Sequence, residues 1–299
     1  MPFKQELLHS KANKWLVQGN FISGNPVPAI MGIVNNTPDS FFDGGKYNST
    51  ELALAHAIEL LDAGAIIIDI GGESSRPGSV KVPADEEIRR VVPVIRELNA
   101  LKSKRNFFIS IDTVKSKTAK EALKAGADII NDISALSMDS EMPDLIKETG
   151  ASCILNHIRG NFGTMQQDFK PYEDVVAEVK TELLRAAQKL LDLGVKKETI
   201  CLDPGIGFGK TGKDNLDLIA SAEEFLDTGF PLLYGMSRKS YIGKIPSLKE
   251  SDRLIPTIAS GIIAALGGAT VLRVHDVSET KESLALLEAF RNDGSLLAL

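Results

Sequence analysis

The chain repeats one local pattern, in which a helical stretch ends at a glycine, a short apolar run follows, and a polar residue ends that run. DAGAIIIDIGGE (62–73), KAGADIINDI (124–133), ETGASCILNH (148–157) and GGATVLRVHD (267–276) all have it. Glycine suits the left-handed conformation that caps a helix C-terminus, and an uninterrupted apolar run suits a parallel strand covered on both faces. Each segment therefore predicts a helix that leads into a buried parallel strand.

The same pattern, followed along the whole chain, predicts an alternation of strands and amphipathic helices. Strands are expected at 28–35, 66–71, 107–113, 129–133, 152–157, 199–205, 232–238 and 270–276. Amphipathic helices are expected between them, for example at 51–64, 85–100 and 173–194. Alternation of this kind predicts an α/β fold of the (β/α)8 TIM-barrel type, with a doubly wound open sheet as the alternative.

No linker rich in proline, glycine or serine divides the chain, so we expect one domain over residues 1–299. Residues 1–27 precede the first strand as an N-terminal extension. Within them, LVQGNFISGNP (16–26) predicts a short hairpin that closes the bottom of the barrel.

Composition narrows the class of partner. A net charge of -6 argues against general binding to nucleic acid or to an anionic membrane surface, and no apolar run approaches the ~20 residues of a membrane span. Cys153 and Cys201 lie in predicted strands without the spacing of metal ligands, which predicts buried reduced thiols. These features indicate a cytoplasmic protein that acts on small molecules.

Polar residues gather where the predicted strands end, which is where the active site of such a barrel lies. They are Asn35, Glu73, Ser75, Arg76, Asp112, Asn131, Asp132, His157, Asp203, Ser237, Arg238, Lys239, Arg273 and His275. Arg273 and His275 are two residues apart and share one face of a strand, which suits phosphate oxygens, with a structural salt bridge as the alternative. GIGFGKT (205–211) ends like a phosphate-binding loop, but Pro204 replaces its first glycine, so a glycine-rich loop after the sixth strand is the better interpretation.

The most specific segments are GIVNNTPDSFFDGG (32–45), DIGGESSRPGS (69–79), SIDT (110–113), NDI (131–133), LDPGIGFGK (202–210), GMSRKS (235–240) and RVHD (273–276). In this combination and order they resemble the dihydropteroate synthase family of pterin-binding barrels. The resemblance implies a transferase of folate biosynthesis, which condenses 6-hydroxymethyl-7,8-dihydropterin diphosphate with p-aminobenzoate to give 7,8-dihydropteroate and diphosphate.

The resemblance also implies roles for particular residues. It assigns the pterin ring to Asp112, Asn131, Asp203 and Lys239, with Asp203 accepting two N–H groups of the guanidine-like edge. It assigns diphosphate to Asn35, Arg76, Arg273 and His275, and makes Asn35 the protein ligand of Mg²⁺. It assigns p-aminobenzoate to Ser75, Pro77, Phe208, Lys239 and Ser240. The catalytic residues implied are Asp43, Lys239, Arg273 and His275, with Asp43 and Phe41 covering a cationic intermediate.

Chemistry and residue types agree with a dissociative substitution, because neutralised diphosphate is a good leaving group and a dihydropterin can carry the resulting cation. The resemblance further implies a homodimer and a target of sulfonamides. Departures from the family pattern are visible as well: Ser75 stands where the family usually has threonine, and Asn36 and Phe42 replace commoner loop residues. NHIRG stands where MHM-type sequences are usual, which leaves the role of His157 open. The alternatives are a methyltetrahydrofolate-type pterin methyltransferase and a non-catalytic pterin-binding barrel.

Overall fold

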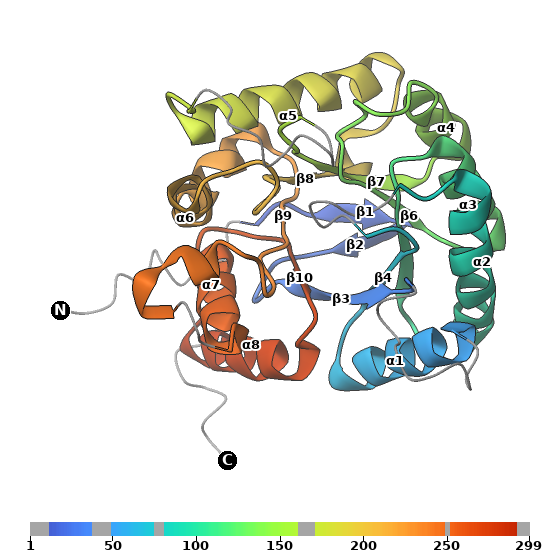
Figure 1. The fold of residues 1–299 in the computed structure, drawn as a ribbon, viewed down its shortest axis with the longest axis horizontal. Coiled ribbons are helices and arrows are strands. Elements are labelled where there is room, and N and C mark those ends of the chain that lie inside the picture. The colour runs from blue at the N-terminus through green and yellow to red at the C-terminus, as the bar shows by residue number, and fades with distance from the viewer. Residues whose placement is uncertain (1–11, 38–48, 75–80, 161–170, 249–251, 292–299) are drawn as a thin grey trace.

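The computed structural model describes residues 12–37, 49–74, 81–160, 171–248 and 252–291, and these form a barrel of parallel strands surrounded by helices (Figure 1). The strands are β3 (Ala29–Asn35), β4 (Ile67–Gly71), β5 (Phe108–Asp112), β6 (Ile129–Asp132), β7 (Ser152–Asn156), β8 (Ile200–Asp203), β9 (Leu233–Tyr234) and β10 (Val271–Val274). The helices around them are α1 (Ser49–Ala63), α2 (Ala84–Leu101), α3 (Ser116–Ala125), α4 (Met142–Thr149), α5 (Val175–Asp192), α6 (Gly212–Ala220), α7 (Leu254–Leu266) and α8 (Val277–Arg291).

The sheet closes on itself. Its eight strands follow the order β8-β7-β6-β5-β4-β3-β10-β9. The two ends of that order meet at a parallel bridge between Leu202 and Leu232, and the backbone N–H of Leu202 donates to the carbonyl of Pro231 at 2.9 Å. The predicted (β/α)8 barrel is confirmed, and the doubly wound open sheet is excluded because such a sheet has two free edges.

The glycines that end the predicted helices have the expected conformation. Gly64, Gly126, Gly150 and Gly268 all have positive φ, between 65° and 116°. This left-handed geometry turns the chain from a helix back into the sheet, and a side chain at these positions would be strained. The recurring glycine is therefore the physical cause of the repeated junction.

All eight barrel strands are at least one residue shorter than predicted, and for β8 and β9 the local backbone explains where the strand ends. β8 ends at Asp203 because Pro204 has no N–H to donate and Gly205 follows with φ 71°. β9 covers only Leu233–Tyr234 instead of 232–238, because the chain turns out of the sheet and Arg238 adopts φ 54°. Both strands end in loops at the C-terminal rim of the barrel.

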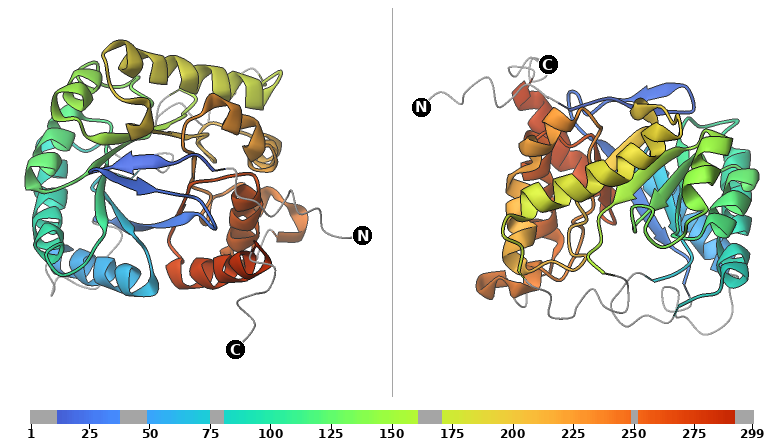
Figure 2. Two further views of the ribbon diagram at one scale, coloured as in Figure 1. Left: turned by 180° about the vertical axis from the view of Figure 1, so that it is seen from behind. Right: turned by 90° about the horizontal axis from the view of Figure 1, so that it is seen from above.

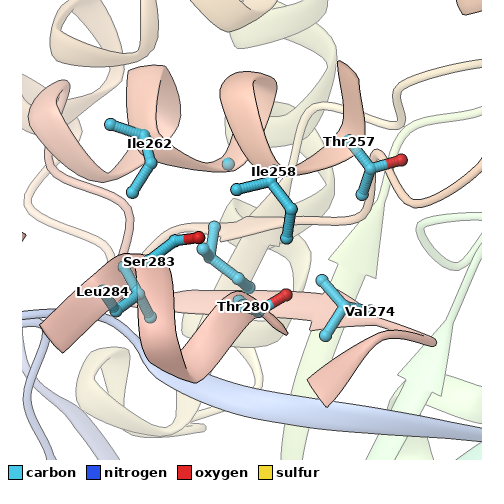
Figure 3. A pocket seen from close by; sticks show the side chains of 9 residues that line it. Thr257, Ile258, Ile262, Val274, Thr280, Ser283 and Leu284 are labelled. Atoms are coloured by element: carbon cyan, nitrogen blue, oxygen red, sulfur yellow. The ribbon is translucent and has the colours of Figure 1, made fainter. Parts of the chain in front are cut away.

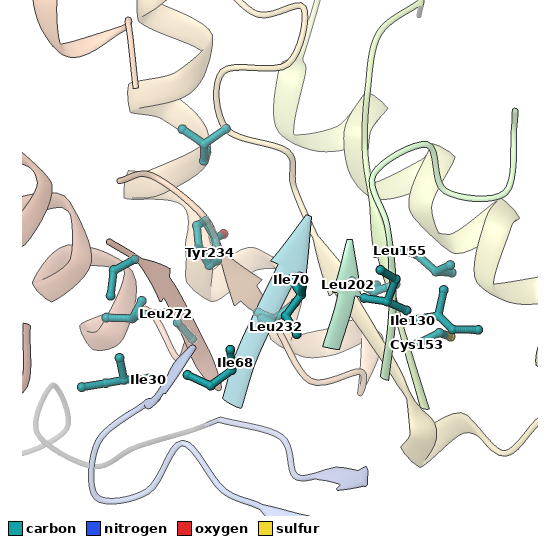
Figure 4. Close-up of a cluster of buried hydrophobic side chains, with 14 of the residues drawn as sticks. Ile30, Ile68, Ile70, Ile130, Cys153, Leu155, Leu202, Leu232, Tyr234 and Leu272 are labelled. Carbon is teal, nitrogen blue, oxygen red and sulfur yellow. The ribbon is translucent and has the colours of Figure 1, made fainter. Parts of the chain in front are cut away.

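Side chains alternate between two apolar layers. Ile68 and Ile70 of β4, and Cys153 and Leu155 of β7, face the helices, where they join the outer core shown in Figure 4. The residues between them face the barrel interior. Both cysteines are free and buried, and burial raises the pKa of each thiol, so the prediction of buried reduced thiols is confirmed.

The predicted N-terminal hairpin consists of β1 (Trp15–Val17) and β2 (Asn20–Ile22), which pair antiparallel. It lies across the N-terminal end of the barrel (Figure 2, left). Trp15, Val17 and Ile22 form one buried cluster with the first inward residues of the strands, which are Met31, Ile67, Ile129, Ile154, Cys201, Leu233 and Val271. The hairpin therefore seals the bottom of the barrel with apolar side chains, as predicted.

We expect Trp15→Phe to lower the free energy of unfolding by about 1–3 kcal/mol, because the smaller ring leaves space and the carbonyl of Thr199 loses a hydrogen bond. The indole Nε1–H of Trp15 donates to that carbonyl at 3.1 Å, and the side chain is fully buried. Urea denaturation followed by far-UV circular dichroism measures the change, since Trp15 is the sole tryptophan of the chain. The exposed Lys14→Ala is the control, and equal midpoints for the two variants would contradict the sealing role.

Among the described residues, no helix combines the length and the apolar character that crossing a membrane requires.

Candidate active site

The barrel interior changes from apolar to polar along the strands. Above the apolar cluster at the bottom, the next inward positions carry Asp69 on β4, Ser110 on β5, Asn131 on β6 and Arg273 on β10. Inward positions near the C-terminal ends carry Asn35, Asp112, Asn156 and Asp203. Since side chains two residues apart in a strand share a face, this polar layer follows directly from the apolar one. The C-terminal rim is therefore the candidate active site.

Strand register places several predicted residues side by side. Asn35 pairs with Gly71, Gly71 with Asp112, and Asp112 with Asn131. A Cβ atom on Gly71 would stand 3.6 Å from Asn35 Oδ1 and 3.8 Å from Asp112 Oδ2. Glycine at this position keeps the space between the amide and the carboxylate open, as a ligand site requires.

Arg273 connects two carboxylates in the polar layer. Its Nε donates to Asp69 Oδ2 at 2.6 Å and one terminal nitrogen donates to Asp112 Oδ2 at 2.7 Å. Asn131 Nδ2 donates to the same oxygen of Asp69 at 3.0 Å. Of the two sequence-based hypotheses for Arg273, the salt bridge is present, and the guanidinium also remains at the barrel mouth with 16% of its side chain exposed.

One guanidinium shared by two buried carboxylates shapes their ionisation. Burial raises the pKa of Asp112 to about 7; Arg273 opposes the rise and Asp69 adds to it. Burial also works against the charge on Arg273, but Asp69 and Asp112 outweigh it and raise the pKa of Arg273. Arg273 therefore stays positive, while Asp112 can take up or release a proton near neutral pH.

Asp203 and Lys239 lie near Arg273 at the mouth, and Phe208 lies against Lys239. Asp203 is buried, and its Oδ1 accepts the backbone N–H of Gly205 at 2.8 Å. Lys239 Nζ donates to the carbonyl of Ile206 and lies 4.2 Å from the centre of the Phe208 ring. Burial raises the pKa of Asp203 and lowers that of Lys239 to about 8, and each charge partly offsets the effect on the other. Lys239 thus holds the loop after β8 through the carbonyl of Ile206, and the charge of Asp203 favours its ammonium form.

His275 follows β10 and is oriented by Ser237. The hydroxyl of Ser237 lies 3.0 Å from His275 Nδ1 and accepts the backbone N–H of His275 at 3.2 Å. With Nδ1 engaged by the hydroxyl, the ring is fixed on the same rim as Arg273. Ser240 is exposed next to Lys239. The predicted residues Asp43, Ser75, Arg76 and Pro77, together with Phe41, lie outside the described residues.

Two polar strand-end residues serve local structure. Asp132 accepts the backbone N–H groups of Ser134 at 2.8 Å and Leu136 at 2.9 Å, and so closes the turn after β6. Arg238 makes a two-point contact with Asp276, at 2.9 Å and 2.5 Å, on the protein surface. Neither residue contributes to the cluster at the mouth.

A small cavity between α7, α8 and β10 lies outside the barrel interior (Figure 3). Its lining residues are Thr257, Ile258, Gly261, Ile262, Leu272, Val274, Thr280, Ser283 and Leu284. No titratable carboxylate, amine or imidazole is among them, so the cavity is a packing defect of the outer layer and the chemistry belongs to the mouth.

The part of the chain that carries these residues matches a known protein family. The family model described as a pterin binding enzyme matches residues 31–275. The chain belongs to this pterin-binding family. The dihydropteroate synthase of Escherichia coli K12 is 45% identical over 262 residues, which cover 88% of this chain and 91% of that protein. The Bacillus subtilis 168 dihydropteroate synthase is 40% identical over 267 residues, which cover 89% and 90%.

Solved structures of the family superpose along nearly the whole chain. The Xanthomonas albilineans dihydropteroate synthase with 4-aminobenzoic acid matches with a TM-score of 0.84 and 37% identity, over 94% of this chain and 98% of that one. The same enzyme in complex with 7,8-dihydropteroate gives 0.81 and 35%, over 93% and 98%. A Yersinia pestis dihydropteroate synthase with a sulfonamide drug complex gives 0.84 and 39%, over 93% and 99%.

His157, whose role the sequence left open, lies below the mouth of this family member. Its Nδ1 accepts from Lys210 Nζ at 2.9 Å, so the ring proton is on Nε2, which donates to Glu182 at 2.9 Å. Burial lowers the pKa of His157 to about 4, and Lys210 adds to that effect. His157 is therefore neutral at physiological pH and holds Lys210 in place.

Lys210 was not singled out from the sequence. Besides His157, its ammonium group donates to the carbonyls of Gly205 at 2.9 Å and Phe208 at 3.2 Å. It thereby fastens both ends of the glycine-rich loop from inside. In the sequence, Lys210 is marked only by its position at the end of GIGFGK, a segment that ends like a phosphate-binding loop. That similarity gives no indication of the contacts that Lys210 makes with its own loop.

We expect Lys210→Met to raise the pKa of His157 from about 4 by roughly one pH unit, because a neighbouring positive charge is removed while burial remains. NMR titration of the ring signals measures it, and a chain with 4 histidines is simple to assign. Glu182→Gln should move the pKa in the opposite direction, since Glu182 raises it. An unchanged His157 pKa in Lys210→Met would contradict the assigned contact, and the exposed Lys213→Met is the control.

Other missed residues share one property. Asp69 Oδ1, Ser110 Oγ and Asn156 Oδ1 are buried and have no hydrogen-bond partner within the described part of the chain. All three belong to inward positions of the polar layer. Buried polar atoms are normally paired, so this layer is completed by a ligand or by ordered water.

Proposed function

We propose that this chain is a dihydropteroate synthase, which joins a dihydropterin methyl diphosphate to p-aminobenzoate and releases diphosphate. The observation that carries the proposal is the match, over 93–94% of the chain, to synthases solved with 4-aminobenzoic acid and with 7,8-dihydropteroate. The polar layer of the barrel supports it, because a buried carboxylate and a buried guanidinium suit a pterin and a diphosphate.

The pterin occupies the polar layer. Asp203 accepts the ring N–H and an amino N–H of the guanidine-like edge with its carboxylate, and Asp112, Asn131 and Lys239 bind other polar atoms of the ring. Their positions around the mouth support this assignment, since Asp112 and Asn131 are paired in register and Lys239 lies near Asp203. A buried charged acceptor gives this binding its strength.

The reaction is a dissociative substitution. The bond between the pterin methylene carbon and the diphosphate oxygen breaks, and its electron pair leaves with diphosphate. Arg273 and His275 hold that oxygen-rich group, together with Asn35 and Arg76. The lone pair of the arylamine then forms the new carbon–nitrogen bond, and the amine loses a proton to solvent. The protein positions both partners and excludes water from the cation; Asp43 is assigned to covering this cation.

We also propose that Mg²⁺ binds with the diphosphate. The donor set fits, because the oxygens of Asn35 and Asp112 flank the open space at Gly71, and Mg²⁺ prefers oxygen ligands from few side chains, phosphates and water. Asn35 would hold the ion, which neutralises diphosphate charge when bound. Within the described residues no cluster of three histidine, cysteine or acidic side chains could hold a metal alone, which agrees with a site that substrate completes.

A homodimer is proposed through α7 and α8, which pack against each other. Ile255 and Ile263 of α7 are 79% and 48% exposed, and Leu286 and Phe290 of α8 are 62% and 60% exposed. Exposed apolar side chains on two helices that contact each other suit a self-complementary interface. Light scattering of the protein and of an Ile255→Glu/Phe290→Glu variant tests this, and equal masses would refute it.

The two free thiols support a reducing compartment, so we infer that the protein works in the cytoplasm.

One assay tests the proposed activity. Purified protein is incubated with Mg²⁺, the dihydropterin diphosphate and p-aminobenzoate, and diphosphate and dihydropteroate are measured. Formation of both in equal amounts is the expected result. Methyl transfer from a methyltetrahydrofolate would instead favour the methyltransferase alternative, and pterin binding without either reaction would favour a non-catalytic barrel.

We expect p-aminobenzoate to bind at least about tenfold more tightly when diphosphate and Mg²⁺ are present, because the anion orders the rim that receives the arylamine. Calorimetry with p-aminobenzoate alone, with diphosphate and with both ions measures this coupling. Diphosphate should gain the same factor from p-aminobenzoate. Equal p-aminobenzoate affinity under all conditions would rule out the coupling.

A further inference from the structure

Asn156 faces the barrel interior directly beside the proposed pterin carboxylate. It is the last residue of β7 and is paired in register with Asp203 of β8. Ile154 belongs to the interior cluster at the barrel bottom, whereas Cys153 and Leu155 belong to the outer core. Alternation along the strand therefore turns Asn156 inward, one layer closer to the mouth than Ile154.

The amide oxygen of Asn156 is buried and unpaired. The residue is 1% exposed, and Oδ1 has no hydrogen-bond partner among the described residues. An acceptor in that situation loses its bonds to water and gains none in return. Such an atom in the interior of a binding barrel indicates a donor that arrives with the ligand.

The donors of the loop after β8 that lie on this side of the barrel have other partners. Gly205, whose Cβ would stand 2.8 Å from Asn156 Oδ1, donates its N–H to Asp203 Oδ1. Lys210 donates to His157 and to loop carbonyls. Because Gly205 has no side chain, no protein atom from this loop takes the place of the missing donor. The oxygen thus stays available to a molecule in the mouth.

The chemistry of a pterin supplies such a donor. A carboxylate that accepts the ring N–H and one amino N–H leaves the second N–H of the exocyclic amino group pointing past it, toward the neighbouring strand. We propose that Asn156 Oδ1 accepts this second N–H, which makes Asn156 a specificity residue for the amino group. This inference rests on the proposed function, because it requires Asp203 to hold the pterin edge.

The test uses Asn156→Leu, which keeps the side-chain volume and removes the unpaired amide, so that folding is retained. Calorimetry compares wild type and variant with two probes, 6-hydroxymethylpterin and its 2-desamino analogue. We expect the variant to bind 6-hydroxymethylpterin about 5- to 30-fold more weakly and the desamino analogue within about twofold of wild type. Asn20→Leu, at an exposed position of the hairpin, is the matched control.

Each outcome decides the matter. An equal loss with both probes would reduce Asn156 to a shape contact and overturn the proposal, as would wild-type affinity for 6-hydroxymethylpterin in Asn156→Leu. If wild-type protein forms dihydropteroate while the variant shows either of those results, only this inference fails. If wild-type protein neither binds the pterin nor forms product, the proposed function fails and this inference falls with it.

Discussion

Replacing Asp203 by asparagine is expected to weaken binding of 6-hydroxymethylpterin about 30- to 1000-fold, which corresponds to about 2–4 kcal/mol. An amide has one acceptor and one donor end, so it cannot accept two N–H groups from the pterin edge. One ring donor then faces the amide N–H in a buried site, where a mismatched pair is most costly. Calorimetry of the purified variant measures the loss.

Two comparisons make the Asp203 result specific. Asp217→Asn makes the same carboxylate-to-amide change on the surface of α6, away from the mouth, and should leave the affinity for 6-hydroxymethylpterin unchanged. Asp203→Asn should also keep the wild-type fold by circular dichroism, because Oδ1 can still accept the N–H of Gly205. Wild-type pterin affinity in this variant would remove the assignment of the pterin edge to Asp203.

Arg273→Met is expected to lower the free energy of unfolding by about 3–5 kcal/mol at pH 8 and to abolish measurable turnover. The variant leaves Asp69 and Asp112 buried without the guanidinium that both contact, and an unpaired buried charge is strongly destabilising. Turnover is lost as well, because the same guanidinium is assigned to diphosphate. Urea denaturation and the synthase assay measure the two effects separately.

The pH dependence of this destabilisation has a definite sign. Burial already raises the pKa of Asp112 to about 7 in the presence of Arg273, and removing Arg273 raises it further. The folded variant therefore holds protons that the unfolded chain, with an ordinary carboxyl pKa of 3.8, has released. Folded wild type takes up the same proton below about pH 7, so only above pH 7 does the folded variant hold a proton that folded wild type has released. In that range the stability of the variant rises relative to wild type as pH falls. The deficit against wild type should shrink from pH 9 to pH 7.

A double variant separates the effect of Arg273 on stability from its effect on turnover. Asp69→Asn combined with Arg273→Met removes one of the two stranded carboxylates and should recover part of the stability, while turnover stays lost. Arg89→Met, at an exposed surface ion pair, is the control for loss of an arginine. A pH-independent deficit, or full recovery of turnover in the double variant, would contradict the shared-guanidinium account.

The fold was predictable from sequence because one local rule repeats at four helix-to-strand junctions, those after α1, α3, α4 and α7. Gly64, Gly126 and Gly150 have the left-handed conformation that the rule requires. The rule does not predict the length of a short strand. β9 has only two residues, although its sequence fits a longer strand equally well. The chain leaves the sheet after Tyr234 and turns at Arg238 with φ 54°, and a positive φ at a residue other than glycine is not visible in the sequence.

The candidate site was predictable in its outer layer and not below it. Asp112, Asn131 and Asp203 stand at strand ends, where a polar residue is conspicuous. Asp69 lies two residues deeper within a buried strand, and its importance appears only when Arg273 reaches it across the barrel. Asp132 was grouped with the site, although it follows Asn131 directly and alternation alone turns it outward.

Lys210 illustrates a different limit. Nothing in GIGFGK indicates that its last side chain turns back beneath its own loop, because the contact with His157 joins segments 53 residues apart. Such a contact is a property of the folded chain. The position of the loop residue Phe208 is therefore set by a buried lysine that sequence patterns do not reveal.

Because the N-terminal hairpin closes the bottom of the barrel with apolar side chains, ligands can enter the barrel only at its C-terminal rim. Every molecule that reaches Asp203 must enter past the rim and depart by the same route. We therefore expect ordered binding, in which the pterin binds first at the deeper position and the arylamine binds second, nearer the rim. The joined product then leaves with its arylamine end first. An arylamine that arrives too early blocks the passage, which predicts inhibition of the reaction at high p-aminobenzoate concentration.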